Sequence, residues 1–261
     1  TALSIVVAGS SIALIVGLPL GRAIGIAVGW RVTFLIIAAI AFGVLGLLAA
    51  VLKKSPSDNN FSLRKLPALI KTPSLWGIYL LTLVAISGHF TAYSYIEPFL
   101  SRIAGLGNNA ITVVLTLFGA VDLVGSFIFS RHYNNNVETF FKMAVAGLCF
   151  CLLMLLPASC TEWSAFLQCM LWGLSINFFN LSFQSEIIRH APQGTAVAMS
   201  IYSGIYNVGI GTGALVGGSV CDGIGIRYIG YVGGAIALAA VIYCIRHVVP
   251  VLRRATAGAE I

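Results

Sequence analysis

Long apolar stretches separated by short polar segments run through the whole chain. Eight of them reach the length of a membrane-spanning helix, at about residues 2–28, 32–52, 75–96, 110–130, 143–160, 163–185, 196–221 and 228–245. Such a helix needs about 20 mostly apolar residues, because the hydrocarbon layer is roughly 30 Å thick and a helix rises about 1.5 Å per residue. The pattern therefore predicts an all-α membrane protein with eight transmembrane helices.

The composition agrees with a lipid environment. Apolar residues make up 59% of the chain and charged residues 9%, against roughly 25% charged in a soluble domain. The cysteines lie in or at the ends of apolar spans, with no CxxC pair and no histidine at metal-ligand spacing, at positions 149, 151, 160, 169, 221 and 244. We expect them to be small packing or lipid-facing residues, with no bound metal and no cofactor.

The basic residues are distributed unevenly between alternate loops. One side of the predicted membrane holds eleven of them: Lys53, Lys54, Arg64, Lys65, Lys71, Arg131, Lys142, Arg189, Arg246, Arg253 and Arg254. The other side holds Arg31, Arg102 and Arg227, and Arg22 lies within the first span. Cytoplasmic loops carry the excess of Lys and Arg, so both chain ends are expected to face the cytoplasm. The net charge of +7 is thus a topology signal and predicts no nucleic-acid partner.

One hydrophilic segment divides the chain. We interpret residues 53–74 as a cytoplasmic linker between residues 1–52, with two helices, and residues 75–249, a six-helix bundle followed by a tail at 250–261. The second half of this linker, after Ser62, could form an interfacial helix. At an offset of 196 residues the chain matches itself at nine of about 40 positions, which pairs the first two spans with the last two. If each repeat holds six helices, the first repeat lacks four here, and the absence of an initial Met also suggests a longer protein.

Small residues are concentrated in two spans. The first contains Gly9, Gly17, Pro19, Gly21 and Arg22 in a segment where glycines allow close helix contact and proline allows a bend. Ordinary helix packing and a transporter motif both explain them.

The seventh span contains the glycine run 209, 211 and 213, which superficially imitates a nucleotide-binding loop. Because it lies inside 26 uncharged residues rather than after a strand, packing of a mobile helix is the better explanation.

Polar side chains in the third and fourth spans are candidates for function. His89, Tyr93 and Glu97 follow one another at i, i+4 and i+8 and are expected to share one helix face, with Tyr95 beside them. Polar groups at membrane depth are costly and tend to line an aqueous cavity, although a lone histidine can also be a packing residue. Asp122 lies in the middle of the fourth span. It and Glu97 are the candidates for proton coupling, with a structural pair or a capping role as the alternatives.

The sixth and seventh spans supply amides and hydroxyls. The predicted substrate-binding set comprises His89, Tyr93, Tyr95, Asn177, Asn180, Gln184, Ser203 and Asn207. Amides and aromatic rings suit a sugar, whose hydroxyls donate and accept hydrogen bonds and whose ring faces stack. The same groups also suit hydrogen bonds between helices.

No enzyme motif is present in the sequence: there is no G-x-S-x-G elbow and no Walker A loop. We therefore expect a protein that is not an enzyme and that draws on an ion or substrate gradient.

Five segments carry a resemblance to a known family. They are residues 1–25, GWRVTF at 29–34, LRKLPALIKTPSLWGIYLLT at 63–82, HFTAYSYIEPF at 89–99 and YSGIYNVGIGTGALVG at 202–217. With them the chain resembles bacterial sugar efflux transporters of the major facilitator superfamily, in the twelve-helix proton antiporter branch that exports arabinose and isopropyl-thiogalactoside. The resemblance implies a partial major facilitator fold, with the last two helices of the N-terminal bundle and the complete C-terminal bundle.

The resemblance also implies a function. It predicts export of sugars or sugar-like molecules across the bacterial inner membrane in exchange for protons, by alternating access, with the chain acting as a monomer in the bilayer. Arg22 stands where the antiporter motif usually has a second glycine, and Asp122 where a small residue is usual. A nucleoside or drug exporter of the same superfamily, and a truncated or non-transporting membrane protein, remain the alternatives.

Overall fold

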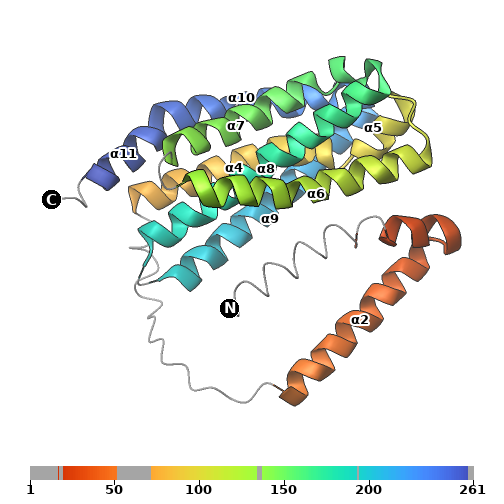
Figure 1. Ribbon diagram of the computed structural model, residues 1–261, viewed down its shortest axis with the longest axis horizontal. Helices are drawn as coiled ribbons and strands as arrows, with labels where there is room; N and C mark the ends of the chain where they lie inside the picture. Colours follow the sequence, from red (N-terminus) through yellow and green to blue (C-terminus); the bar gives the residue numbers. More distant parts are fainter. Residues whose placement is uncertain (1–16, 18–19, 52–71, 134–136, 193, 258–261) are drawn as a thin grey trace. The chain divides into compact units, whose positions relative to one another are not determined.

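The computed structural model describes residues 17, 20–51, 72–133, 137–192 and 194–257 (Figure 1). Within these residues the regular structure is entirely helical, as predicted. The chain divides into two compact units, residues 1–62 and 63–261, which we describe separately. The predicted linker at 53–74 falls largely outside the described residues, so its role as a domain boundary stays a prediction.

The first unit contains two helical segments joined at a glycine. Residues 20–28 are helical, and α2 runs from Trp30 to Val51. Between them Gly29 has a φ of +94°, a conformation that L residues rarely adopt. The glycine therefore ends the first span where the polar pattern predicts a boundary. No side chain of α2 is buried within the unit, which suits a helix surrounded by lipid or by other apolar helices.

The second unit is a helical bundle. Its main elements are α4 (Pro73–Tyr93), α5 (Ile96–Arg102), α6 (Asn108–His132), α7 (Val137–Met154), α8 (Glu162–His190), α9 (Thr195–Asp222), α10 (Ile229–Tyr243) and α11 (Val249–Ala257). Short 3₁₀ turns at Pro157–Cys160 and Ile226–Tyr228 precede α8 and α10.

The described helices confirm a membrane protein but not the count of eight spans. Six helical stretches are long and apolar enough to cross a bilayer: Trp30–Val51, Pro73–Arg102, Asn108–His132, Val137–Met154, Glu162–His190 and Ile226–Arg253. Helix α9 has 28 residues, which is also long enough, but its Gly, Ser, Tyr and Asn content keeps it out of this set. Most of the first predicted span, residues 1–16, 18 and 19, lies outside the described part.

Hydrogen bonds and close contacts fix the helix directions within the bundle. Helices α4 and α9 run parallel, because Tyr79 near the start of α4 donates to the Ala198 carbonyl at 3.0 Å and Tyr95, just after α4, donates to Ala214 at 3.1 Å. Helix α10 packs against both α4 and α7 and runs antiparallel to both. This arrangement brings α4, α6, α8 and α9 around one polar interior.

Small residues allow these helices to approach closely. A Cβ on Gly233 of α10 would lie 2.5 Å from the Gly88 carbonyl oxygen of α4, which no real side chain permits. On α9, glycines at 209, 213 and 217 contact α4, whereas Gly211 has no neighbour within 4 Å. Two members of the glycine run thus serve helix packing as predicted.

Large aromatic and aliphatic side chains fill the rest of the interior. Trp172, Phe141 and Phe183 are completely buried, and the rings of Phe141 and Phe183 stack with centroids 4.4 Å apart. The six cysteines are free thiols, and Cys149, Cys151, Cys169 and Cys244 are buried, as expected of packing residues.

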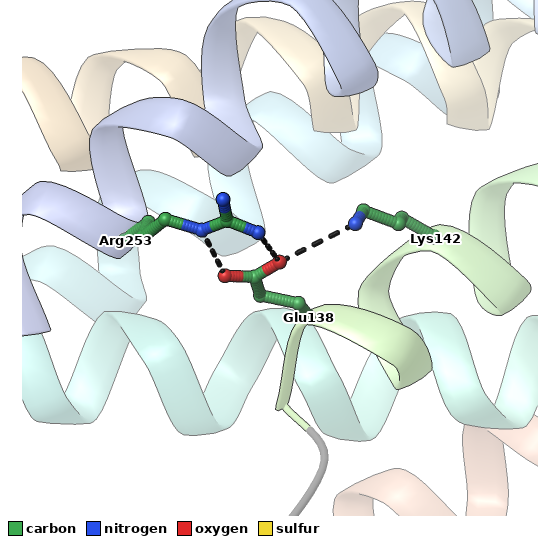
Figure 2. A network of polar contacts seen from close by, with 3 residues as sticks. All are labelled: Glu138, Lys142 and Arg253. Carbon is green, nitrogen blue, oxygen red and sulfur yellow. Dashed lines mark hydrogen bonds and ion pairs between the residues drawn. The ribbon is translucent and has the colours of Figure 1, made fainter.

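An ion-pair network ties the last helix to α7. After α10 the chain forms a π-helical segment, Cys244–Val248, before α11. Pro250 has no N–H to donate to the preceding turn, which favours such an irregularity. Arg253 of α11 then binds both carboxylate oxygens of Glu138 at 2.7 Å, and Lys142 reaches the same carboxylate at 3.3 Å (Figure 2).

The two turns matched by the repeat have the same backbone. Gly225 lies 196 residues after Gly29 and has a φ of +104°, close to the +94° of Gly29. Two residues further on, Arg31 and Arg227 each stack over a neighbouring aromatic ring, at 4.6 and 5.9 Å from its centroid. This correspondence supports the internal repeat.

Candidate functional site

A polar pocket of about 300 Å³ lies between α8 and α9. Its lining consists of Asn180, Gln184, Met199, Tyr202, Ser203 and Tyr206. This volume is at the lower end of ligand pockets, which run from about 300 to 1,000 Å³, and so favours a small solute. Three predicted substrate residues, Asn180, Gln184 and Ser203, meet here.

The pocket wall offers donors, acceptors and ring faces. The Tyr206 hydroxyl lies close enough to the Asn180 side chain to interact with it electrostatically. The hydroxyl of Tyr202 is buried and has no hydrogen-bond partner among the described residues. The two tyrosine rings pack edge to face with centroids 5.8 Å apart. Such a combination can bind hydroxyl groups and also cover the face of a sugar ring.

An aromatic cluster borders the pocket on the α4 side. His89 stacks on Tyr93 at 5.1 Å, and Trp172 of α8 donates its indole N–H to Nδ1 of His89 at 3.0 Å. Because Nδ1 accepts this bond, the neutral ring carries its proton on Nε2. Phe90 connects the cluster to Tyr206, with ring centroids 6.5 Å apart. His89 is 3% exposed, so it does not line the pocket and contributes through its contacts within the aromatic cluster.

Asp122 of α6 lies half-buried beside this cluster. The Asn177 side chain interacts electrostatically with the Asp122 carboxylate, and its Nδ2 donates to the Asp122 backbone carbonyl at 3.3 Å. Tyr93 and Tyr206 lie within electrostatic range of the carboxylate. The structure thus places a titratable group beside two aromatic hydroxyls, one of which lines the pocket.

The expectation that His89, Tyr93 and Glu97 share one continuous helix face is wrong. Helix α4 ends at Tyr93, and Glu97 belongs to the separate helix α5. The break occurs because Pro98 has no N–H for the carbonyl four residues earlier and its ring crowds that turn. Glu97 is exposed, which separates it from the buried cluster around His89.

Three other predicted substrate residues lie away from the pocket. Tyr95 donates to the Ala214 carbonyl and packs its ring against Gly217, which is an interhelical role. Asn207 is exposed and donates to the Ser203 carbonyl of its own helix at 2.7 Å. Asn177 faces α6 rather than the pocket.

The glycine and proline motif of the first span is only partly described. Gly9 and Pro19 lie outside the described residues. A Cβ added at Gly17 would meet nothing within 4 Å in its unit, and one added at Gly21 would lie 3.8 Å from Thr33. Arg22 lies in the helical segment and, like Gly21, is partly buried. The motif's role in transport stays a prediction.

Sequence reasoning missed two interior residues, Trp172 and Glu186. Trp172 organises the aromatic cluster, and no local pattern distinguishes it from a packing tryptophan. Glu186 is 1% exposed, accepts a 2.8 Å bond from Tyr133 and lies 3.5 Å from Arg189 beside a second pocket of about 220 Å³. An acid three residues before an arginine at a helix end was the available signal. Burial and the nearby Glu186 raise the pKa of Tyr133, which therefore stays protonated and donates.

A bundle of long apolar helices around a small polar pocket defines a class, the polytopic membrane proteins that handle small solutes. Residues 1–198 match the family model of the Major Facilitator Superfamily, and the chain belongs to this superfamily.

Curated relatives sharpen this assignment. The chain is 45% identical over 242 residues to a "Probable sugar efflux transporter" of Helicobacter acinonychis (strain Sheeba), covering 93% of this chain and 62% of the relative. It is 46% identical over 237 residues to a protein of the same description from Pasteurella multocida (strain Pm70), covering 91% and 59%. A Helicobacter pylori protein (strain ATCC 700392 / 26695), also so described, is 45% identical over 242 residues, covering 93% and 62%. The chain thus spans about 60% of the length of these relatives.

Proposed function

We propose that the chain exports sugars or sugar-like molecules across the bacterial inner membrane in exchange for protons, by alternating access. The observation that carries this proposal is the pocket between α8 and α9, with its amides, hydroxyls and tyrosine rings. The printed descriptions of relatives at 45% and 46% identity favour sugars over other small solutes.

Proton exchange is supported by the position of Asp122. A carboxylate in the interior of a membrane bundle is costly unless it has a function or a charged partner. The Asp122 carboxylate lies within electrostatic range of Tyr206, which lines the pocket. Binding of a proton at Asp122 can therefore change the electrostatic field at the sugar site. Among the described residues this makes Asp122 a better coupling candidate than Glu97, which is exposed on α5.

The proposed orientation places both ends of the chain in the cytoplasm. Arg131, Lys142, Arg189 and Arg253 lie at one end of the second unit, whereas Arg102 and Arg227 lie at the other. The excess of basic residues at the first end favours its exposure to the cytoplasm. If a thiol reagent applied from the periplasm labelled a cysteine introduced at Arg131, the proposed orientation would be contradicted.

Transport into everted membrane vesicles tests the function. Vesicles that acidify their interior should accumulate a radiolabelled pentose or thiogalactoside when they contain the chain. Gln184→Ala should weaken apparent sugar affinity by about tenfold, because a buried hydrogen bond is lost. Leu167→Ala is the matched control on the same helix, since Leu167 is 59% exposed. Accumulation of nucleosides or chloramphenicol without sugar would assign the pocket to another solute.

Replacing Asp122 tests the coupling. Asp122→Asn should abolish the dependence of sugar accumulation on the pH gradient while sugar exchange continues. An unchanged pH dependence would remove Asp122 from the mechanism.

A further inference from the structure

The side-chain amide of Asn177 is only half satisfied. Its Nδ2 donates to the Asp122 backbone carbonyl at 3.3 Å and to Ser126 Oγ at 3.5 Å. Its Oδ1 is buried and has no hydrogen-bond partner among the described residues. The residue is 7% exposed, and Gly125 lies so close that an added Cβ would be 2.5 Å from Oδ1. A buried acceptor without a donor is costly and calls for an explanation.

The neighbouring carboxyl group can supply the missing donor in one of its two states. An ionised Asp122 only accepts hydrogen bonds, and the nearby Asn177 amide favours that state through its N–H side. A protonated Asp122 gains an O–H, for which Oδ1 of the same amide is the available acceptor. An amide has both a donor and an acceptor, so it can bond to either state of the carboxyl group, which an apolar leucine cannot do.

We propose that Asn177 is the positioning residue that detects proton binding at Asp122 and passes it to the sugar pocket. Asn180 lies three residues further along α8, and it lines the pocket together with Tyr206, with which it interacts electrostatically. A change of partner at Asn177 alters how α8 is held against α6 and therefore where Asn180 and Tyr206 lie. This inference rests on the proposed proton-coupled function and gives Asn177 a role other than sugar binding.

The surroundings of Asp122 are consistent with a single titrating group at this position. From α4 the titratable group that faces it is Tyr93, and from α9 it is Tyr206. Helix α8 contributes the Asn177 amide, and α6 itself contributes Ser126, which holds Nδ2. Both phenols are donors and do not compete with Asp122 for a proton near neutral pH.

Infrared difference spectra between acid and neutral pH test the pairing without any transport. The band of the protonated Asp122 carboxyl is assigned by its loss in Asp122→Asn. In Asn177→Leu this band should move to higher wavenumber, because the carboxyl O–H loses its acceptor. A band at an unchanged position in Asn177→Leu would overturn the proposal.

Flux measurements test the consequence for transport in proteoliposomes containing the chain. Asn177→Leu and Gly125→Ala should each reduce sugar uptake driven by a pH gradient by about tenfold, the change expected for an interaction worth about one pKa unit. Sugar exchange at equal pH should continue. Gly211→Ala is the control, because an added methyl there meets nothing within 4 Å.

The outcomes separate the two proposals. Gradient-driven uptake that remains normal in both variants, or exchange and uptake lost to the same extent, would overturn the role of Asn177. Absence of sugar exchange in the unmodified protein would instead remove the sugar function, and the infrared shift would still decide the Asp122–Asn177 pairing.

Discussion

The helix pairs around Gly29 and Gly225 have the same turn but different surroundings. Both glycines have a φ near +100°, at +94° and +104°, and each is followed by an arginine stacked over an aromatic ring. Yet no side chain of α2 is buried in its unit, whereas α10 buries residues such as Ile229, Ala237 and Ala240. The local sequence therefore determines the turn, whereas the helices packed around each pair determine how far its side chains are buried.

Residues at matched positions explain why α10 packs as it does. Gly230, Gly233 and Gly234 allow α10 to approach α4 and α7. At the offset of 196 residues the first unit has Phe34, Ile37 and Ala38 instead. Glycine at a helix crossing permits backbone contact, and bulky residues at the same positions present an apolar surface. These three differences are among those that suit α10, but not α2, to close helix contact.

The largest expected effect comes from exchanging one of these residues. Gly233→Ile, which installs the first-unit residue, should destabilise the second unit by about 3 kcal/mol or more, because a Cβ there would lie 2.5 Å from the Gly88 carbonyl. The free energy of unfolding in mixed detergent micelles measures the change. Ile37→Val is the control and should change it by less than about 0.5 kcal/mol, since Ile37 is 56% exposed. Similar losses from both would refute the contrast.

Replacing the turn glycines should have an intermediate and equal effect. Gly29→Ala and Gly225→Ala should each cost about 1–2 kcal/mol, because an L residue is strained at positive φ. Gly43→Ala, in open space on α2, should instead stabilise its helix slightly. Thermal denaturation followed by circular dichroism compares the three. A cost at only one of the two turns would show that they are not equivalent.

The smallest expected effect concerns α11, the helix that follows α10 and its π-helical segment. Glu138→Gln should release Arg253 and speed amide hydrogen exchange in α11, because the bidentate ion pair is lost. The ion pair stabilises α11 only modestly, since the side chains of Glu138 and Arg253 are 32% and 68% exposed and solvent screens their charges. Lys142→Gln, which removes one 3.3 Å contact, should change the exchange rate less. Equal exchange in all three proteins would show that the network does not hold α11.

Much of the fold could be predicted because the membrane imposes it. Helix lengths follow from apolar runs, so most spans lie within a few residues of their expected bounds, as α6 and α8 show. The break after Tyr93 could not be predicted from hydropathy, since its cause is the single Pro98. The polar content of α9, with Asn207 and several glycines, lowers its hydropathy although it has the length of a span.

The candidate site was predicted in part. Asn180, Gln184 and Ser203 share a pocket because their spacing on two adjacent helices points them to one interior. The role of Asn177 depends on Gly125, which lies 52 residues earlier on another helix, and no local spacing reveals that contact. Likewise His89 could be recognised as unusual from the sequence, but its partner Trp172 is 83 residues away.

The bond between Trp172 and His89 makes the protein an optical reporter of its own interior. Trp172 is completely buried, whereas Trp30, Trp76 and Trp163 are 61%, 54% and 84% exposed. Its indole is therefore the one among the four that is enclosed by protein, and its emission should respond to changes inside the bundle. Any event that charges the imidazole must sever the indole bond, because a protonated Nδ1 cannot accept it, so a change in Trp172 emission would report protonation of His89.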